Sequence, residues 1–171
     1  MSIDLSNLFS KDETVYFFDG EIVGSDVNLN LKEFEVLDPI KYKGEICKVN
    51  REYIINISTY YTFKTNCDRC LNSTIKNVKS SLSAKLEDYK KMQEEDEEEE
   101  DIIYYKNDVL DIEKYVLMEV LSSLPMKTLC KEDCKGLCPL CGTDFNKKSC
   151  DCIVENIDPR FEKLKNFFDK N

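Results

Sequence analysis

Apolar and polar residues alternate along the first half of the chain, a pattern that predicts β-strands. The clearest run is YIINISTYYTF, residues 53–63, in which every second residue from Ile55 to Phe63 is apolar or β-branched. A period of two places one set of side chains on each face of a sheet. Residues 27–31 and 40–46 alternate in the same way. In the second of these we expect a turn or bulge at Gly44.

The long alternating run is followed by NCDRCLN, residues 66–72, and then by another alternating run over residues 73–89. This spacing predicts a β-hairpin whose connecting turn carries Cys67 and Cys70.

Two later segments have the wider apolar spacing of helices. Residues 111–125, DIEKYVLMEVLSSLP, begin with Asp111 as a suitable N-cap and end at Pro125. Their apolar face is wide enough to pack on the sheet. Residues 157–168, IDPRFEKLKNFF, predict a short amphipathic helix near the end of the chain. Its apolar residues are Phe161, Leu164, Phe167 and Phe168.

These elements predict an α+β fold: a twisted antiparallel β-sheet or partial barrel with one packed helix, a C-terminal cysteine-rich zinc module and a short amphipathic helix. We expect a β-rich domain over residues 1–91 and an acidic mobile loop over 92–101. A strand and a helix over 102–126 should pack on the β-domain, and the zinc module with its terminal helix should occupy 127–171.

Charge is spread unevenly over the chain, whose formal net charge is −10. Eight consecutive acids contribute most of it. They are Glu94, Glu95, Asp96, Glu97, Glu98, Glu99, Glu100 and Asp101. Such a run repels itself too strongly to pack. Residues 41–91, by contrast, carry a local charge of +6. Net charge argues against a simple nucleic-acid binder, but the middle segment could present a basic face.

Composition excludes several classes of protein. The start of the chain has no secretory signal pattern, and no apolar run reaches the roughly 18 residues that span a bilayer. We therefore expect a cytoplasmic protein with no membrane partner and no small-molecule substrate. The chain contains no histidine, which removes the catalytic arrangements that need an imidazole.

Nine cysteines are the main chemical signal. A reducing cytosol keeps thiols reduced, so metal ligation is the leading interpretation. Eight cysteines form closely spaced pairs: Cys67 and Cys70, Cys130 and Cys134, Cys138 and Cys141, and Cys150 and Cys152. Four pairs supply two tetrathiolate sites, which predicts two structural Zn²⁺ ions. In the CPLCG turn, Gly142 allows positive φ just after a ligand.

Other interpretations of the cysteines remain open. They could be reduced thiols without metal, a redox-active dithiol, or ligands of an iron–sulfur cluster. The pairs could group compactly, with the first two pairs on one ion and the last two on the other, or Cys67 and Cys70 could join Cys138 and Cys141. Cys47 has no partner and is expected to be a small buried apolar residue. Asp68, Asp144 and Asp151, beside the cysteines, are typical turn residues.

Several motifs together resemble the YceD family, the large ribosomal RNA subunit accumulation proteins. They are CDRCL at residues 67–71, SSLPMKTLCKEDCKGLCPLCGTDFN at 122–146, CDC at 150–152 and IDPRFEKL at 157–164. The resemblance implies a non-enzymatic bacterial factor required for accumulation of 23S rRNA, acting in its synthesis, processing or assembly into the large subunit. Some family members look shorter at the carboxyl end and lack the second cysteine cluster.

Two binding hypotheses follow. The first is contact with rRNA or a pre-large-subunit particle, through cations and aromatic rings suited to phosphates and bases. Its candidate residues are Lys64, Arg69, Lys76, Lys79, Tyr60 and Tyr61. The second hypothesis is an acidic module in which residues 94–101 capture a basic ribosomal protein. An enzyme is disfavoured, because closed four-cysteine sites leave no open position for water or substrate.

Overall fold

The structure is a computed structural model that describes residues 2–10, 14–23, 34–50, 52–90 and 102–153. Three predictions from the sequence lie outside these residues. They are the strand over 27–31, the acidic loop over 92–101 and the amphipathic helix over 157–168 with Phe161, Leu164, Phe167 and Phe168.

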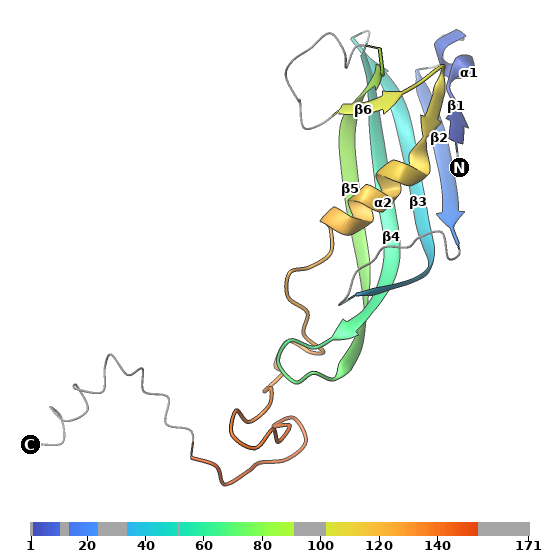
Figure 1. Cartoon of the computed structure of the whole chain (residues 1–171). Coiled ribbons are helices and arrows are strands. Elements are labelled where there is room, and N and C mark those ends of the chain that lie inside the picture. Colours follow the sequence, from blue (N-terminus) through green and yellow to red (C-terminus); the bar gives the residue numbers. More distant parts are fainter. Residues whose placement is uncertain (1, 11–13, 24–33, 51, 91–101, 154–171) are drawn as a thin grey trace, which may run out of the picture.

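An open five-stranded sheet forms the body of the protein (Figure 1), with its strands in chain order from one edge to the other. They are β2 (Val15–Ile22), β3 (Glu35–Val49), β4 (Glu52–Asn66), β5 (Ser73–Asp88) and β6 (Ile102–Tyr105). The first four strands are antiparallel, whereas β6 runs parallel to β5. The predicted α+β fold is confirmed, and of the two forms expected, a sheet or a partial barrel, the protein has an open sheet. The sheet was expected to be antiparallel, and the parallel direction of β6 was not evident from the pattern.

A smaller two-stranded sheet and two helices complete the fold. The small sheet pairs β1 (Ser2–Asp4) with β7 (Val109–Asp111). Between β1 and β2 lies the short helix α1 (Ser6–Ser10), which the sequence pattern did not reveal. Helix α2 (Ile112–Ser122) follows β7 directly and lies across β4 and β5 (Figure 1).

The core lies between α2 and one face of the sheet. The predicted alternation in β4 holds, because Ile55, Ile57 and Phe63 are almost fully buried on this face. From α2 the buried side chains are Ile112, Val116 and Val120, which are one helical turn apart and line the same stripe. Burial of this apolar surface is what fixes α2 against the sheet. No helix within the described ranges lies over the opposite face.

The ends of α2 are close to those predicted. Asp111 occupies the N-cap position but makes no side-chain capping hydrogen bond. At the other end, the backbone N–H of Ser123 donates to the carbonyl of Glu119, and Pro125 follows two residues later.

Gly44 is not at a turn or bulge, so that prediction is wrong. It pairs in register with Phe18 on β2 and Ile57 on β4, in the middle of β3. A Cβ atom at this position would overlap the carbonyl oxygen of Asn56 and the ring of Phe18. Glycine is therefore required because a ring packs directly over the backbone. The irregularity in β3 lies instead between Leu37 and Lys41, where its register against β4 shifts.

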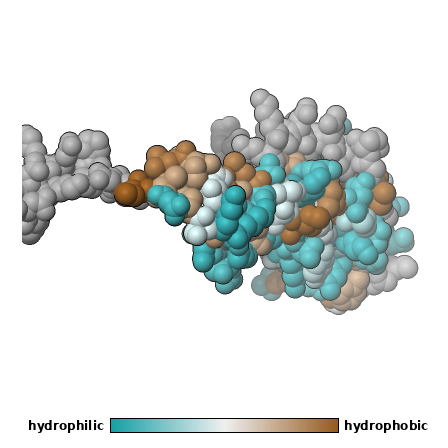
Figure 2. Space-filling view, turned by 90° about the horizontal axis from the view of Figure 1, so that it is seen from below, coloured by the Kyte–Doolittle hydropathy of each residue, from teal (hydrophilic) through white to brown (hydrophobic). Residues whose placement is uncertain are grey.

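The cysteine-rich segment extends beyond one end of the sheet. Strands β4 and β5 reach past their neighbours and carry the turn that meets residues 128–134 (Figure 1). Seen from this end, the surface is largely hydrophilic, with the apolar colour confined to separate patches (Figure 2). Among the described helices, none combines the length and apolar character that crossing a bilayer requires.

Candidate metal centres

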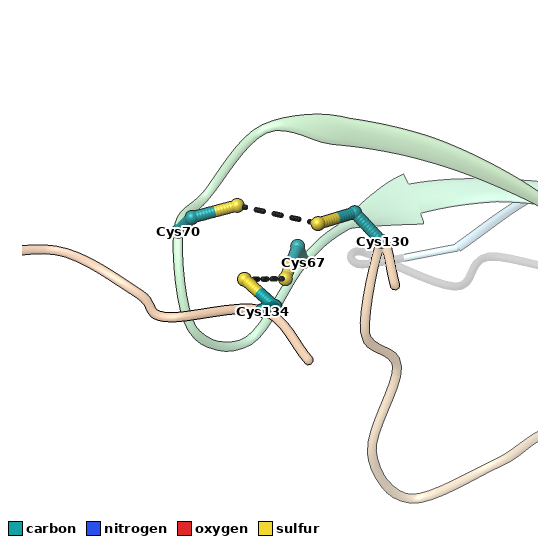
Figure 3. A group of neighbouring side chains, drawn as sticks. All are labelled: Cys67, Cys70, Cys130 and Cys134. Atoms are coloured by element: carbon teal, nitrogen blue, oxygen red, sulfur yellow. Dashed lines mark hydrogen bonds between the residues drawn. The ribbon is translucent and has the colours of Figure 1, made fainter. Parts of the chain in front are cut away.

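The turn between β4 and β5 presents two cysteines side by side, as the sequence predicted. The N–H of Cys67 donates to the carbonyl of Asn72, and the N–H of Leu71 donates to the carbonyl of Cys67. These bonds, 2.9 and 2.8 Å long, close a tight loop. Cys70 lies within that loop, and the side chains of Cys67 and Cys70 both point into the group of four cysteines (Figure 3).

Two further cysteines approach from the segment after α2. The Sγ atoms of Cys67 and Cys134 are 3.8 Å apart, and those of Cys70 and Cys130 are 3.6 Å apart (Figure 3). A disulfide bond is about 2.05 Å long, so neither contact is one. Four sulfurs around one ion at metal–sulfur bonds of about 2.3 Å would lie about 3.8 Å from one another. The spacing therefore fits a single tetrahedral ion.

Residues around the turn fix the two segments to each other. The N–H of Asp68 donates to the carbonyl of Thr128 at 2.9 Å, and the carboxylate of Asp68 accepts from the N–H of Thr128. The guanidinium of Arg69 donates to the carbonyl of Cys134 at 2.8 Å. Gly136 has a φ of 77° and lies against the carbonyl of Arg69, where a larger residue would be both strained and crowded. The first centre thus forms where hydrogen bonds join the β4–β5 turn to the segment after α2.

The second group of cysteines lies on the segment that follows. The N–H of Cys138 donates to the carbonyl of Thr143, and the N–H of Gly142 donates to the carbonyl of Cys138. Gly142 has a φ of 71°, so the predicted positive φ in the CPLCG turn is confirmed. The sulfurs of Cys138, Cys141, Cys150 and Cys152 all lie within 4.8 Å of one another.

The eight cysteines therefore form two groups of four. The first is Cys67, Cys70, Cys130 and Cys134, and the second is Cys138, Cys141, Cys150 and Cys152. This is the compact arrangement, and the crossed alternative is wrong. An iron–sulfur cluster in which each iron takes its own thiolates holds them farther apart than a single ion does. The close sulfurs favour one ion in each group.

The two groups differ in burial. Cys67, Cys70 and Cys134 are at most 3% exposed, and Leu129 and Leu137 pack against them. In the second group Cys138 is buried, but Cys141 is exposed. The first centre is part of a small core, whereas the second is open to solvent on at least one side.

Local hydrogen bonds set the acidity of the first group. Burial opposes ionisation of Cys67, but backbone N–H groups of Cys130, Arg69 and Cys70 outweigh it and lower the pKa of this thiol to about 6. For Cys130, burial comes first, and its hydrogen bonds to the other sulfurs add to it. Together they raise the pKa of Cys130 to about 12. Without a cation, the four thiols cannot all ionise, and a bound dication supplies the missing charge.

The second group likewise contains one thiol with a lowered pKa and one with a strongly raised pKa. The hydroxyl and backbone N–H of Thr143 donate to Cys141 and lower the pKa of its thiol to about 6. Hydrogen bonds to Cys141 and Cys150 raise the pKa of Cys152 to about 12. Each group therefore contains a thiol that ionises readily and can act as the first ligand of an incoming metal ion.

Two asparagine amides that the sequence analysis missed support the sulfurs. The Nδ2 of Asn72 donates to Cys70 Sγ at 3.3 Å, and the Nδ2 of Asn146 donates to Cys134 Sγ at 3.4 Å. Such donors orient ligands and stabilise their negative charge. Asn72 lies two residues after Cys70, and this short separation was the only feature of the sequence that could have indicated its role. Asn146 is 12 residues from Cys134, and only the fold brings them together.

Asp144 is a turn residue, as expected, and it also joins the module to the hairpin. Its carboxylate accepts from the backbone N–H and side-chain amide of Asn146 and from the amide of Asn72, at 2.8 to 3.0 Å. The backbone N–H of Asn146 is the largest of these influences, and together they lower the pKa of Asp144 to about 2.

The structure does not bring the six predicted RNA-contact residues onto one surface. Tyr61 is 3% exposed and its hydroxyl meets Val120 and Ser123 on α2. Lys76 lies beside Phe63 on the core face, with its Nζ 3.5 Å from the carbonyl of Cys130.

The remaining members are divided as well. Arg69 is committed to Cys134, as described above, and Lys64 pairs with Glu35 at 3.0 Å. Lys64 shares the opposite face of the sheet with Tyr60 and Lys79, but only Tyr60 and Lys79 are cross-strand partners.

On that face a tyrosine lies among lysines. The Nζ atoms of Lys79 and Lys43 are 5.5 and 5.8 Å from the ring centroid of Tyr60. Lys41 is its direct neighbour on β3 but pairs with Glu21 at 3.3 Å. Acids on β2 therefore offset the lysines here.

Two other predictions concern residues outside both centres. Glu94, Glu95, Asp96, Glu97, Glu98, Glu99, Glu100 and Asp101 lie outside the described residues. Cys47 belongs to neither group of cysteines and is only partly buried, on the sheet face away from α2. The expectation of a small buried residue at this position is wrong.

Comparison with known proteins follows the cysteine-rich half of the chain. A sequence profile described as "Large ribosomal RNA subunit accumulation protein YceD" matches residues 55–168. A chloroplastic protein of Arabidopsis thaliana, named a large ribosomal RNA subunit accumulation protein YCED homolog, is 35% identical over 57 residues. Uncharacterized proteins of Mycobacterium bovis and Mycobacterium tuberculosis are 36% identical over 58 residues.

These alignments cover only a small part of each related protein. They cover 33% of this chain and 18% of the plant protein. For the mycobacterial proteins they cover 34% of this chain and 28% of the relative. The chain therefore matches less than a third of any of these proteins. No solved structure matches it.

Proposed function

The chain belongs to the YceD family of large ribosomal RNA subunit accumulation proteins, and on this premise we propose that it is a non-enzymatic factor for accumulation of 23S rRNA. It acts in the cytoplasm of a bacterium, in synthesis or processing of that RNA or in its assembly into the large subunit. It does so by binding rRNA or a ribosomal protein. Family membership is the observation that carries this proposal.

We further propose that both cysteine groups hold Zn²⁺ as structural ions. Thiolate ligands in tetrahedral geometry are the usual environment of structural zinc. Four sulfurs within 4.8 Å of one another supply that set in each group. A closed four-ligand site has no open position for water or substrate, so such ions stabilise the fold without activating a reactant. Structural ions of this kind agree with the proposal that the protein is not an enzyme.

Metal analysis tests the zinc assignment. Protein purified without oxygen should contain two zinc ions per chain, measured by inductively coupled plasma mass spectrometry. Negligible bound metal would contradict metal ligation altogether, and iron in place of zinc would contradict the choice of metal.

Affinity capture from growing cells tests the function. RNA and protein in the eluate are both quantified, and a tagged unrelated acidic protein serves as the control. Enrichment of 23S precursor or of large-subunit assembly particles supports an assembly factor that works at the rRNA. If the captured chain carries neither this RNA nor any ribosomal protein, the proposed function is wrong.

The acidic run in the sequence favours a second candidate, a chaperone-like module for one basic ribosomal protein without direct RNA contact. Eight consecutive acids over residues 94–101 offer a counter-charge to such a cation-rich partner. Deleting these residues separates the two candidates. Loss of a basic protein partner, with rRNA association retained, would favour capture of that protein by the acidic run.

A further inference from the structure

An open hollow of about 510 Å³ lies on the cysteine module, outside both metal centres. Two separate segments build it. Lys135 comes from the segment after Cys134, and residues 145–149 come from the turn before Cys150. The lining residues are Lys135, Phe145, Asn146, Lys147, Lys148 and Ser149.

Hydrogen bonds donated by backbone N–H groups hold the two walls of this hollow in place. The N–H of Lys135 donates to the Oδ1 of Asn146 at 3.0 Å, and the N–H of Phe145 donates to the carbonyl of Gly136 at 3.0 Å. The N–H groups of Lys147 and Lys148 both donate to the carbonyl of Asp144, at 3.0 and 3.1 Å. The lysines are therefore mounted on fixed backbone, which lowers the ordering cost of binding.

The charge of the hollow is positive. All three lysines are exposed, and no carboxylate lines it. Lys147 pairs with Asp144 at 3.5 Å. Within the described ranges, neither Lys135 nor Lys148 has an acid within ion-pair distance. This differs from the face around Tyr60, where neighbouring acids offset the lysines.

The side chains suit a nucleic-acid strand. Ammonium groups of lysine bind phosphate as point charges, and an aromatic ring provides a platform on which a base can stack. Phe145 is partly exposed and lines the hollow together with the lysines. Ser149 adds a hydroxyl to the lining. A ring flanked by cations is the arrangement that proteins use for single strands, whose bases are free to stack.

We propose that this hollow binds a single-stranded segment of RNA, with Lys135 and Lys148 on the phosphates and Phe145 against a base. The inference rests on the proposed function, since it names the surface through which the protein contacts rRNA.

The test measures binding of a fluorescein-labelled single-stranded oligouridylate by the full-length, metal-loaded protein, using fluorescence anisotropy over a series of salt concentrations. The main variant is Lys135→Gln with Lys148→Gln. Each lost phosphate contact should reduce the slope of log K against log salt by about 0.7, so the slope should fall by about 1.4. Metal content is measured alongside, because these lysines also lie near thiolates.

The matched control is Lys106→Gln with Lys114→Gln, which changes net charge equally on exposed residues far along the chain from the module. This control should leave both the affinity and the slope as in the wild type. Phe145→Leu should weaken binding about tenfold with an unchanged slope, because stacking releases no counterions.

Three results would overturn the inference. One is an equal loss of affinity in the two lysine double variants, which would show an effect of net charge alone. Another is a loss of RNA binding that follows loss of metal. A third is equally tight binding of polyglutamate, which would make the hollow a general anion site.

The failure of this inference can be told apart from failure of the proposed function. If Lys135→Gln with Lys148→Gln still co-purifies with 23S precursor as the wild type does, the function holds and this surface is wrong. If the wild type co-purifies with a ribosomal protein but not with rRNA, the surface alone is wrong. If it co-purifies with neither, the function fails, and the surface fails with it.

Discussion

Tyr60 and Tyr61 are neighbours on β4, yet their side chains lie on opposite faces of the sheet. Tyr60 faces away from α2, among lysines of the neighbouring strands. Tyr61 points into the core, where its hydroxyl lies 3.3 Å from the carbonyl of Val120 and 3.0 Å from the Oγ of Ser123. Burial of the ring raises the pKa of Tyr61. The hydroxyl thus ties β4 to the end of α2, where the chain turns toward the first centre.

Tyr61→Phe should destabilise the protein by about 1 kcal/mol, because the buried carbonyl of Val120 and hydroxyl of Ser123 lose a partner. Tyr60→Phe is the matched control and should change the free energy of unfolding by less than about 0.5 kcal/mol. Urea unfolding followed by circular dichroism measures both. Equal stability of the two variants would mean that the hydroxyl of Tyr61 contributes nothing.

Replacing a single cysteine ligand should affect stability differently in the two centres. Cys134→Ser removes a buried ligand at the junction with the sheet, so we expect one bound ion fewer and a thermal midpoint lower by about 5 °C or more. Cys150→Ser should also remove one ion but leave the sheet's midpoint nearly unchanged, since none of the four cysteines of that centre belongs to the β4–β5 turn. Metal content and differential scanning calorimetry test this together. Equal shifts in the two midpoints would contradict the assigned difference.

At the scale of elements, the β4–β5 hairpin organises the molecule. Its two strands are the longest pairing in the sheet, its core face receives α2, and its turn supplies half of the first centre. On its other side, β4 pairs with β3, in which Gly44 lets the ring of Phe18 lie on the backbone. The position of β2 at the sheet edge therefore depends on a residue without a side chain.

Gly44→Ala should cost about 1 to 3 kcal/mol, because the added methyl group overlaps both a backbone carbonyl and a ring. Ser58→Ala, at a neighbouring position on the face away from α2, is the control and should be nearly neutral. Chemical denaturation gives the difference. A Gly44→Ala variant as stable as the wild type would show that β2 can shift without loss.

At the scale of the whole molecule, the folded state is coupled to metal and therefore to pH. Cys130 and Cys152, with pKa values raised to about 12, are protonated at neutral pH in the metal-free protein. Metal binding must displace these protons, so acidification favours the metal-free form.

We expect the apparent metal affinity to fall about tenfold per pH unit for each proton displaced. Dialysis against a chelator between about pH 8 and pH 5, followed by metal analysis, measures this. Because the pKa of Asp144 is lowered in the folded protein, its carboxylate stabilises the fold at pH values above its ordinary pKa of 3.8. This stabilisation is lost only as the pH falls toward about 2. A loss of structure at pH 5 therefore does not come from Asp144. Metal retention that is constant over this range would contradict the coupling.

Much of this architecture could be predicted from local patterns. Alternation located β4 and β5, and helical spacing located α2, because each depends on neighbours within a few residues. Pairs of cysteines indicated the two centres for the same reason. Sequence patterns failed to predict features that depend on contacts between residues far apart in the chain. The ring of Phe18 over Gly44 and the amide of Asn146 at Cys134 depend on three-dimensional approach alone.

The candidate RNA surface shows the same limit. Lys76 and Lys79 looked like neighbours in the sequence, but three residues along a strand place them on opposite faces. Lys135 and Lys148 are 13 positions apart in the sequence, and neither segment alone suggests a site.

The first centre joins cysteines that are made at different times. Cys70 and Cys130 are separated by 60 residues. At about 5 to 20 residues per second, synthesis of that stretch takes on the order of 3 to 12 seconds. During this interval the nascent chain already carries the Cys67 and Cys70 turn, with only half of its ligands. The hairpin must wait, open to exchange with other thiols and metals, until the second half emerges and closes the site.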